Sequence, residues 1–359
     1  MDNPIAKEII RRYDALKGQR GTWENHWTEI AARVLPRYAN TFQTPDSGIT
    51  RGQKRTEQMF DATAATALER FAAAMESMLT PRNQQWHTLK ASDPKINKDR
   101  QVKLYFEEAT NILFKYRYSP GSLFIDYHDD GGLRYQSVNL RELMFDMSHQ
   151  GVVDTSYRKY TLTARQMKQR LDVGRFKSLP DKVIACLKDK PDEMFEIIHC
   201  VKPNAEVDKS KLDHRGKRFA SFYICVEGNV LLSQGGMNTF PYPVSRYVTG
   251  PGELYGRSPA MLALPAIKVL NEQKKTILKQ GHRIVDPVLL THDDGVLDTV
   301  SLKPGATNPG GVNAQGQRLV HELPVGNLAV GQDMMDMERQ VINDVFLVSL
   351  FQILVDTPA

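Results

Sequence analysis

Two strings of the sequence His-Asp-Asp-Gly, at 128–131 and 292–295, contain the residue types best suited to chemistry. Imidazole and carboxylate groups can hold a divalent metal ion or transfer protons, as in a metal-dependent nuclease. Adjacent residues on a strand point to opposite faces, so a single string cannot converge on one ion without ligands from elsewhere in the chain. Asp-Gly is also a preferred hairpin turn. The strings therefore favour turns over a metal site, and the nuclease stays an alternative.

Other catalytic signatures are missing from the sequence. There is no G-x-x-x-x-G-K-[ST] or G-x-G-x-x-G phosphate loop, no G-x-S-x-G elbow and no H-E-x-x-H pair. Gly250-Pro251-Gly252 reads as a loop, because proline removes one of the amide donors that a phosphate cradle needs. We expect a non-enzymatic protein with no catalytic residue, no cofactor and no metal.

Composition indicates an ordinary globular protein of two or three structural units. The 359 residues are 41% hydrophobic and 25% charged, with a formal net charge of +5. This mild basicity permits contact with nucleic acid without requiring it. Three cysteines without C-x-x-C spacing favour a reducing compartment. We expect no secretory signal and no membrane span, because the longest apolar stretch, 345–355, is far shorter than the about 20 residues needed.

The first two thirds of the chain predict an α+β unit. Asp2 or Asn3 caps a helix that ends near Gly18, a second helix ends at Pro36, and a third begins at Asp61. From 123 to 248, short strands alternate with turns: a hairpin at 123–138, an antiparallel pair at 195–201 and 219–232, and two short helices at 163–171 and 181–187. The βαβ rhythm of a nucleotide-binding sheet is missing.

The last hundred residues predict two long helices joined by a small module. The helix at 259–284 is about 39 Å long. Residues 287–325 change to β-branched pairs interrupted by Gly and Pro, and a second helix covers 330–354. That helix is apolar nearly all round from 345 to 354. It must be buried on several sides, in a core or in a subunit interface.

The charged face of the first long helix allows two interpretations. It is a solvated surface with an internal Lys268–Glu272 pair, or it presents Lys275, Lys279 and Arg283 to a polyanion. Lys274 lies inside the apolar stripe. It either snorkels to solvent or belongs to an intersubunit seam.

Several stretches in a fixed order resemble the portal (head-to-tail connecting) proteins of short-tailed bacteriophages. The specific part is 255–287, with Tyr-Gly-Arg-Ser-Pro at its start, Leu270-Asn271 within it and Asp286-Pro287 at its end. Weaker matches are the string Phe-Asp-Ala-Thr at 60–63 and Arg-Lys-Tyr-Thr-Leu-Thr at 158–163. The match extends over nearly the whole chain.

The resemblance implies the portal fold and a division of the chain. Residues 1–255 would be the wing, 256–286 the first stem helix and 287–325 a β-rich clip. Residues 326–353 would be the second, antiparallel stem helix and 354–359 the start of the tunnel loop. Compared with the family, we expect the chain to lack the C-terminal wing helix and the crown, and to be short of a helical segment near 119–123.

The resemblance also implies a function, partners and site residues. We expect a ring of identical subunits, commonly a dodecamer, at the portal vertex of the virion, assembled in the host cytoplasm. It would conduct double-stranded DNA without sequence specificity and contact the terminase packaging motor, tail adaptors, and the major capsid and scaffolding proteins. A monomeric scaffold or adaptor is a further alternative. The expected channel residues are Lys268, Lys275, Lys279, Arg283, Val355 and Asp356. The expected clip contacts are Asp293, Asp294, Lys303, Asn308, Gln315 and Arg318, and the expected subunit-interface residues are Lys274, Phe346, Leu350 and Phe351.

Overall fold

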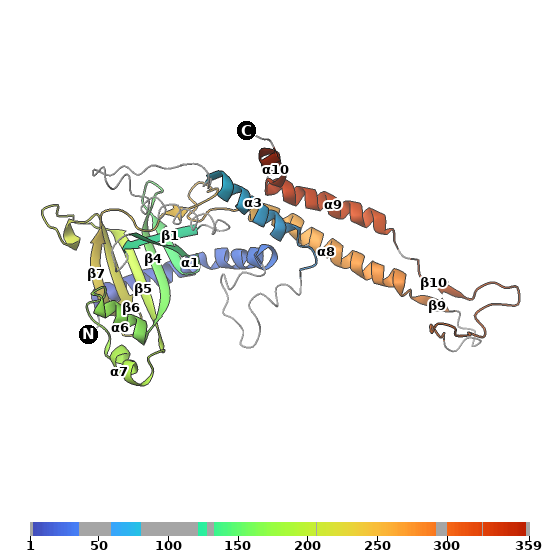
Figure 1. The fold of residues 1–359 in the computed structure, drawn as a ribbon, viewed down its shortest axis with the longest axis horizontal. Coiled ribbons are helices and arrows are strands. Elements are labelled where there is room, and N and C mark those ends of the chain that lie inside the picture. Colours follow the sequence, from blue (N-terminus) through green and yellow to red (C-terminus); the bar gives the residue numbers. More distant parts are fainter. Residues whose placement is uncertain are drawn as a thin grey trace.

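The protein is elongated, with a body built around a β-sheet and a rod made of two long helices (Figure 1). The structure, a computed structural model, describes residues 3–35, 59–79, 121–127, 133–205, 207–291, 300–324 and 326–356. Helices and antiparallel strands both occur along the chain, which confirms the predicted α+β class. Of the segment near 119–123, residues 121–123 begin strand β1 (Gly121–Tyr127), and 119–120 lie outside the described residues.

The N-terminal helix α1 (Pro4–Val34) is continuous. Asn3, one of the two predicted caps, accepts a hydrogen bond from the amide of Ile5 at 2.9 Å. The predicted break at Gly18 is wrong. A helical glycine costs about 1 kcal/mol relative to alanine, and the apolar face that α1 buries on both sides of Gly18 outweighs this cost.

A five-stranded antiparallel sheet forms the centre of the body. Its strand order is β3 (Leu143–Met147), β4 (Val153–Thr163), β5 (Met194–Pro203), β6 (Phe219–Cys225) and β7 (Val230–Met237). The sequence predicted one strand over 219–232. The structure has two, because Gly228 and Asn229 take positive φ angles of 81° and 51° and form a hairpin turn.

The two faces of this sheet pack against different elements. Helix α1 covers one face, where Ile9 and Tyr13 meet Ile198 and Cys200 of β5. The alternate residues of β5, such as Ile197, face α6 (Ala164–Asp172) and α7 (Asp181–Asp189), the two predicted short helices.

A smaller sheet and a short helical turn complete the body. The sheet pairs β1 (Gly121–Tyr127) with β2 (Leu133–Val138) and β8 (Val244–Ser245). Pairing of Tyr127 with Leu133 confirms the predicted hairpin, whereas its turn and the first His-Asp-Asp-Gly string lie outside the described residues. A single 3₁₀ turn, η1 (His214–Gly216), precedes β6.

The rod consists of α8 (Pro259–Val285) and α9 (Leu328–Val345), which run antiparallel. A two-stranded antiparallel sheet of β9 (Leu289–Thr291) and β10 (Val320–Glu322) begins the tip that joins them (Figure 1). The helices approach closely at Gly331, where a Cβ atom would lie 2.8 Å from Cδ1 of Ile277. Helix α3 (Thr63–Leu79) packs on the end of the rod nearer the body.

The predicted second long helix is broken. Helix α9 ends at Val345, Leu347 takes a φ of 55°, and α10 (Val348–Asp356) continues in a new direction. Phe346 and Phe351 both contact the ring of Phe71 on α3, with centroids 6.5 and 5.7 Å away. Two side chains five positions apart on a straight helix point in directions about 140° apart, so only a broken helix brings both rings to Phe71.

Two further predictions concern the C-terminal end and membranes. The backbone at Val355 and Asp356 is helical, where a loop was predicted from 354, and 357–359 lie outside the described residues. Within the part of the chain that the structure describes, no helix has the length and apolar character that would let it cross a bilayer.

Candidate functional site

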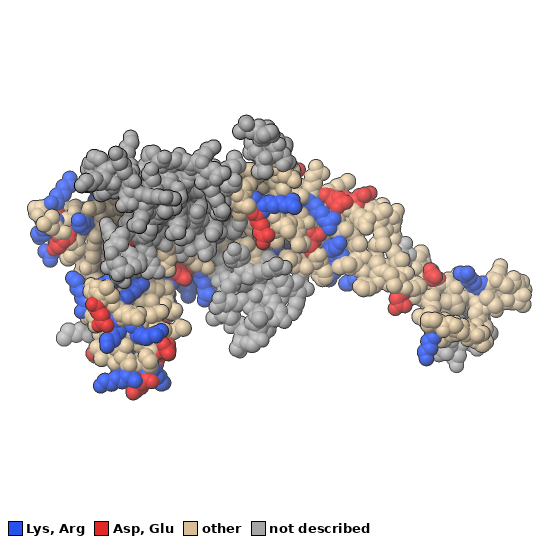
Figure 2. Space-filling view, viewed as in Figure 1, with Lys and Arg blue, Asp and Glu red and all other residues tan. Residues whose placement is uncertain are grey.

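The rod exposes large apolar side chains on both of its helices. Val285 of α8 is 87% exposed and Met337 of α9 is 66% exposed. In the space-filling view most of the rod is uncharged, with basic and acidic groups gathered about half-way along it (Figure 2). Soluble monomers rarely leave apolar surface of this extent uncovered. The exposed apolar residues of the rod, the adjoining start of the tip and α10 are Leu262, Val269, Leu278, Ile284, Val285, Val288, Leu290, Val330, Met334, Met337, Val341 and Leu350.

A groove of about 650 Å³ runs between α8 and α9. Its walls include Val269 and Ile277 of α8 and Val330 and Met334 of α9. Gln273 also lines it, and the buried Oε1 atom of Gln273 has no hydrogen-bond partner among the described residues. A buried acceptor without a donor is costly, so the groove can gain stability from a contact that supplies one.

The predicted basic face of α8 is partly neutralised. Lys268 pairs with Glu29 of α1 at 2.5 Å, so the predicted Lys268–Glu272 pair is wrong. The hydrogen bond that Lys268 donates to Glu29 lowers the pKa of the Glu29 carboxyl. Glu272 lies instead 3.7 Å from Lys275.

Lys279 and Arg283 are the predicted channel residues that remain available. Both are exposed and neither forms an ion pair with any residue that the structure describes. Of the side chains of Val355 and Asp356 nothing is described. Assignment of these residues to a channel remains a prediction.

The predicted subunit-interface residues lie in different environments. Phe346 and Phe351 are buried in the core that α3, α8 and α9 share, so they already have partners within the chain. Leu350 is half exposed and Lys274 is half-buried. Their place in a subunit interface stays a prediction, and Leu350 offers the largest free apolar surface of the four.

At the tip, Asn308 has a structural role in addition to its predicted one. Its Oδ1 accepts a hydrogen bond from the amide of Ser301 at 2.8 Å, and its Nδ2 donates to the carbonyl of Ser301 at 3.0 Å. Lys303, Gln315 and Arg318 are exposed, whereas Asp293, Asp294 and the second His-Asp-Asp-Gly string lie outside the described residues. The contact roles of the tip remain predictions.

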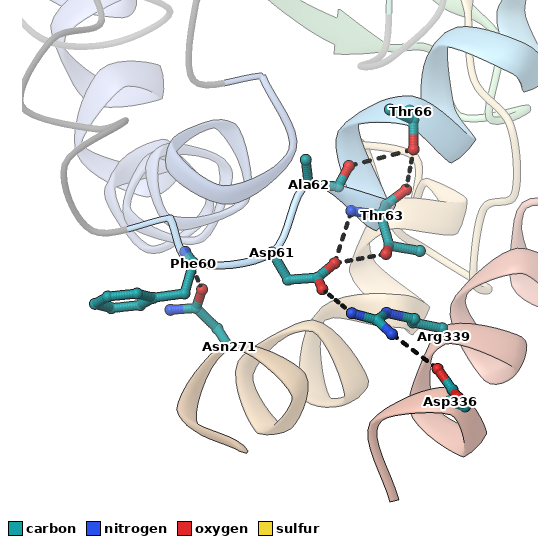
Figure 3. A network of polar contacts seen from close by, with 8 residues as sticks. All are labelled: Phe60, Asp61, Ala62, Thr63, Thr66, Asn271, Asp336 and Arg339. Carbon is teal, nitrogen blue, oxygen red and sulfur yellow. Dashed lines mark hydrogen bonds and ion pairs between the residues drawn. The ribbon is translucent and has the colours of Figure 1, made fainter. Parts of the chain in front are cut away.

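A polar junction ties the start of α3 to both rod helices (Figure 3). Arg339 of α9 donates to Asp61 Oδ2 at 2.7 Å and to Asp336 Oδ1 at 2.8 Å. Asp61 also accepts from the amide of Thr63 at 2.9 Å, and Asn271 of α8 accepts from the amide of Phe60 at 2.8 Å.

The electrostatics of this junction favour the ionised form of Asp61. Burial raises the pKa of Asp61, but hydrogen bonds from Thr63 and Arg339 outweigh burial, and the pKa lies below its ordinary value of 3.8. The sequence indicated a helix start at Asp61, whose side chain caps the turn. No local pattern could have indicated Arg339 as its partner.

The comparisons with known proteins agree with this architecture. The family model of the bacteriophage head to tail connecting protein matches residues 6–117 and 116–359. The chain belongs to this family. The match includes the body, the rod and the tip.

Two relatives carry related names. The chain is similar to the portal protein of Salmonella phage epsilon15, with 25% identity over 97% of this chain and 66% of the relative. It is also similar to the probable portal protein of Bordetella phage BPP-1, with 27% identity over 75% of this chain and 51% of the relative. The chain thus spans between half and two thirds of the length of these relatives.

Proposed function

We propose that this chain is a subunit of a portal ring, which forms the conduit for genome packaging and ejection at one vertex of a phage capsid. The observation that supports this most directly is the apolar surface exposed on both helices of the rod, such as Met337 and Val285. Membership of the head to tail connecting family and the names of the two relatives support the same proposal.

Ring formation explains how the exposed surface would be covered. Each subunit uses two different patches in a head-to-tail contact, and such contacts close into a ring when the rotation permits. With one rod beside the next, the apolar side chains of α8 and α9 would be buried between subunits. We propose a dodecamer with wing, stem, clip and tunnel-loop regions as the resemblance implies.

In the proposed ring, double-stranded DNA passes without sequence-specific contacts. Lys279 and Arg283 are exposed and unpaired among the described residues, and a ring repeats them around one axis. Few cations per subunit suit a conduit, because extensive phosphate contacts would hold the moving duplex.

The other proposed partners follow from location. The tip from β9 to β10 would contact the terminase motor and later the tail adaptors, and the body would contact capsid and scaffolding proteins. We expect the motor to hydrolyse ATP. No cluster of metal ligands occurs among the residues that the structure describes, and no observation favours a nuclease or a monomeric adaptor.

The double variant Lys275→Glu with Lys279→Glu tests the proposed conduit. We expect rings to form while the yield of packaged genome changes, because the charge facing the duplex is reversed. Lys209→Glu, on an exposed loop of the body, is the control and should package as the parent does. Parental packaging by the double variant would contradict the proposed channel position.

A further inference from the structure

Two adjoining hollows lie in the body: one between α6 and the strands β1, β2 and β4, and the other between α1, α6 and β4. The smaller has a volume of about 240 Å³ and the larger about 910 Å³. Their shared wall includes Arg158 and Tyr160 of β4 and Gln166 and Arg170 of α6. We call the smaller one the arginine hollow, because Arg175 also lines it.

The residues around these hollows carry more positive than negative charge. Their carboxylates each have a cationic partner: Glu24 with Arg20, Glu142 with Arg158, Glu196 with Lys159, and Asp126 with Arg175. Three cations of the linings have no ion pair with a described residue: Lys17, Arg141 and Arg170. A surplus of this kind attracts an anion, most strongly where solvent is partly excluded.

Arg20 and Arg170 differ in how their donors are used. Arg20 is 2% exposed and donates to Glu24 and to the carbonyl oxygens of Leu140, Arg141 and Leu143, so its role is structural. Among the described residues Arg170 donates only to the hydroxyl of Tyr160, at 2.8 Å. A guanidinium has five N–H donors, so Arg170 offers unused donors to the hollow.

Arg158 lines the same wall as Arg170, and both guanidinium groups lie against the ring of Tyr160. The guanidinium carbons of Arg158 and Arg170 are 4.9 and 5.6 Å from the ring centroid of Tyr160. Burial raises the pKa of Tyr160, which keeps its hydroxyl protonated. Because that oxygen accepts from Arg170, its own proton can be donated to a ligand.

The local fold positions these groups. Thr163 and Gln166 form a reciprocal capping box that fixes the first turn of α6 and so the placement of Arg170 one helical turn later. Since Gln166 Oε1 accepts from the amide of Thr163, its Nε2 group is what remains for the hollow. Gln166 and Arg170 therefore offer donors to the hollow, whereas Arg158 also bonds Glu142 through Nε and Nη2 and contributes mainly its charge.

We propose that the arginine hollow is a binding site for a compact oxyanion, held between Arg158 and Arg170 with the hydroxyl of Tyr160 as a further donor. Its volume of about 240 Å³ accepts a phosphate or a carboxylate and excludes duplex DNA. The oxyanion is either free inorganic phosphate or a carboxylate of an acidic peptide segment that reaches it through the larger hollow. This inference does not depend on ring formation or on DNA conduction.

Titration calorimetry on the full chain at fixed ionic strength tests the site. One arm uses inorganic phosphate and the other a hexaglutamate peptide, each with chloride as the balancing anion. We expect saturable binding of one or both ligands, weakened at least tenfold by Arg170→Gln. Arg165→Gln, an exposed arginine on α6 outside both hollows, should change affinity less than twofold.

The outcomes distinguish the sources of the oxyanion. Binding of phosphate that Arg170→Gln removes identifies a free ion, and binding of the peptide alone identifies an acidic segment. If Arg170→Gln does not fold, Arg170→Lys serves instead. Lysine keeps the positive charge but lacks the planar guanidinium with its paired donors, so binding should weaken at least threefold. The proposal is overturned if neither ligand saturates, or if the Arg165 and Arg170 variants lose affinity equally.

Discussion

Arg339 donates a hydrogen bond to Asp61 at 2.7 Å, and this contact joins residues 278 positions apart in the chain. It fastens the start of α3 to α9 (Figure 3). Helix α3 in turn supplies Phe71, on which the broken end of the rod packs. The position of α10 therefore depends on a contact that the rod makes with a distant segment.

The two carboxylates that share Arg339 should contribute unequally to the free energy of unfolding. The side chain of Asp61 is 8% exposed and that of Asp336 is 69% exposed. We expect Asp61→Asn to lower the free energy of unfolding by about 1–3 kcal/mol, because the charge-assisted bonds of a buried carboxylate are lost. Asp336→Asn, the matched control, should cost about 0.5 kcal/mol or less. Equal losses in denaturant titrations would contradict this account of the junction.

The same carboxylate predicts a dependence on acidity. Since the folded-state pKa of Asp61 lies below 3.8, its contribution is complete above the unfolded value and is lost as pH falls through the folded pKa. The stability difference between the parent and Asp61→Asn should therefore be constant near neutrality and shrink at acidic pH. Denaturant titrations from pH 7 to the acid limit of folding measure it, and a difference that grows on acidification would refute the assignment.

His199 predicts a second pH effect. It is 1% exposed, its ring contacts Tyr242 Oη at 2.6 Å and Ser221 Oγ at 2.9 Å, and burial holds its pKa well below 6.5. The unfolded chain binds a proton there below pH 6.5 and the folded chain does not, so stability falls as pH drops. The slope is at most about 1.4 kcal/mol per pH unit for one proton.

The variant His199→Gln should remove this slope between pH 6.5 and 5. His149→Gln, at an exposed position, should leave it unchanged. The readout is the slope rather than the absolute stability, because loss of the buried ring also affects packing. An unchanged slope in His199→Gln would place the titrating group elsewhere.

Substitutions at Leu347 test the energetic cost of the break between α9 and α10. Its φ of 55° crowds Cβ against the backbone, at a cost of about 1–2 kcal/mol that glycine does not incur. Leu347→Ala keeps Cβ and loses the half-exposed side chain, whereas Leu347→Gly also loses the strain. We expect the glycine variant to unfold at higher denaturant concentration than the alanine variant. The reverse order would indicate a continuous helix.

Met337 predicts the effect of charge on the exposed apolar face of α9. Met337→Glu should prevent ring assembly. The free energy of unfolding of the single chain should stay within about 0.5 kcal/mol of the parent's, because the side chain is 66% exposed. Gln332→Glu adds the same charge at an exposed position about 140° around α9 and serves as control. Sedimentation velocity separates rings from single chains. Rings of Met337→Glu would show that this face is not in the interface.

The sequence correctly predicted the elements that short-range patterns specify, namely a helix start, a helical period and a hairpin. Asn3-Pro4 predicted the start of α1, and the apolar period from Pro259 predicted α8 within one residue of its observed end. The strand patterns on either side of the turn string at 128–132 predicted the hairpin of β1 and β2.

The predictions that failed depended on tertiary contacts. Gly18 does not end α1, because α1 is buried against the sheet before Gly18 and against the sheet, α3 and α8 after it. Leu347 ends α9, because Phe346 and Phe351 reach the same ring of Phe71. Lys268 pairs with Glu29 across two helices rather than with Glu272 on its own helix. None of these partners is near in the sequence, so period and propensity could not indicate them.

The central claim is that the exposed apolar rod is covered by neighbouring copies of the same chain. Native mass measurement of the full-length protein at micromolar concentration tests it most directly. We expect a single closed species whose mass is a fixed multiple of one subunit, dodecameric by the resemblance to the portal family. A species with the mass of one chain, stable across concentrations and with the rod still exposed, would contradict the claim.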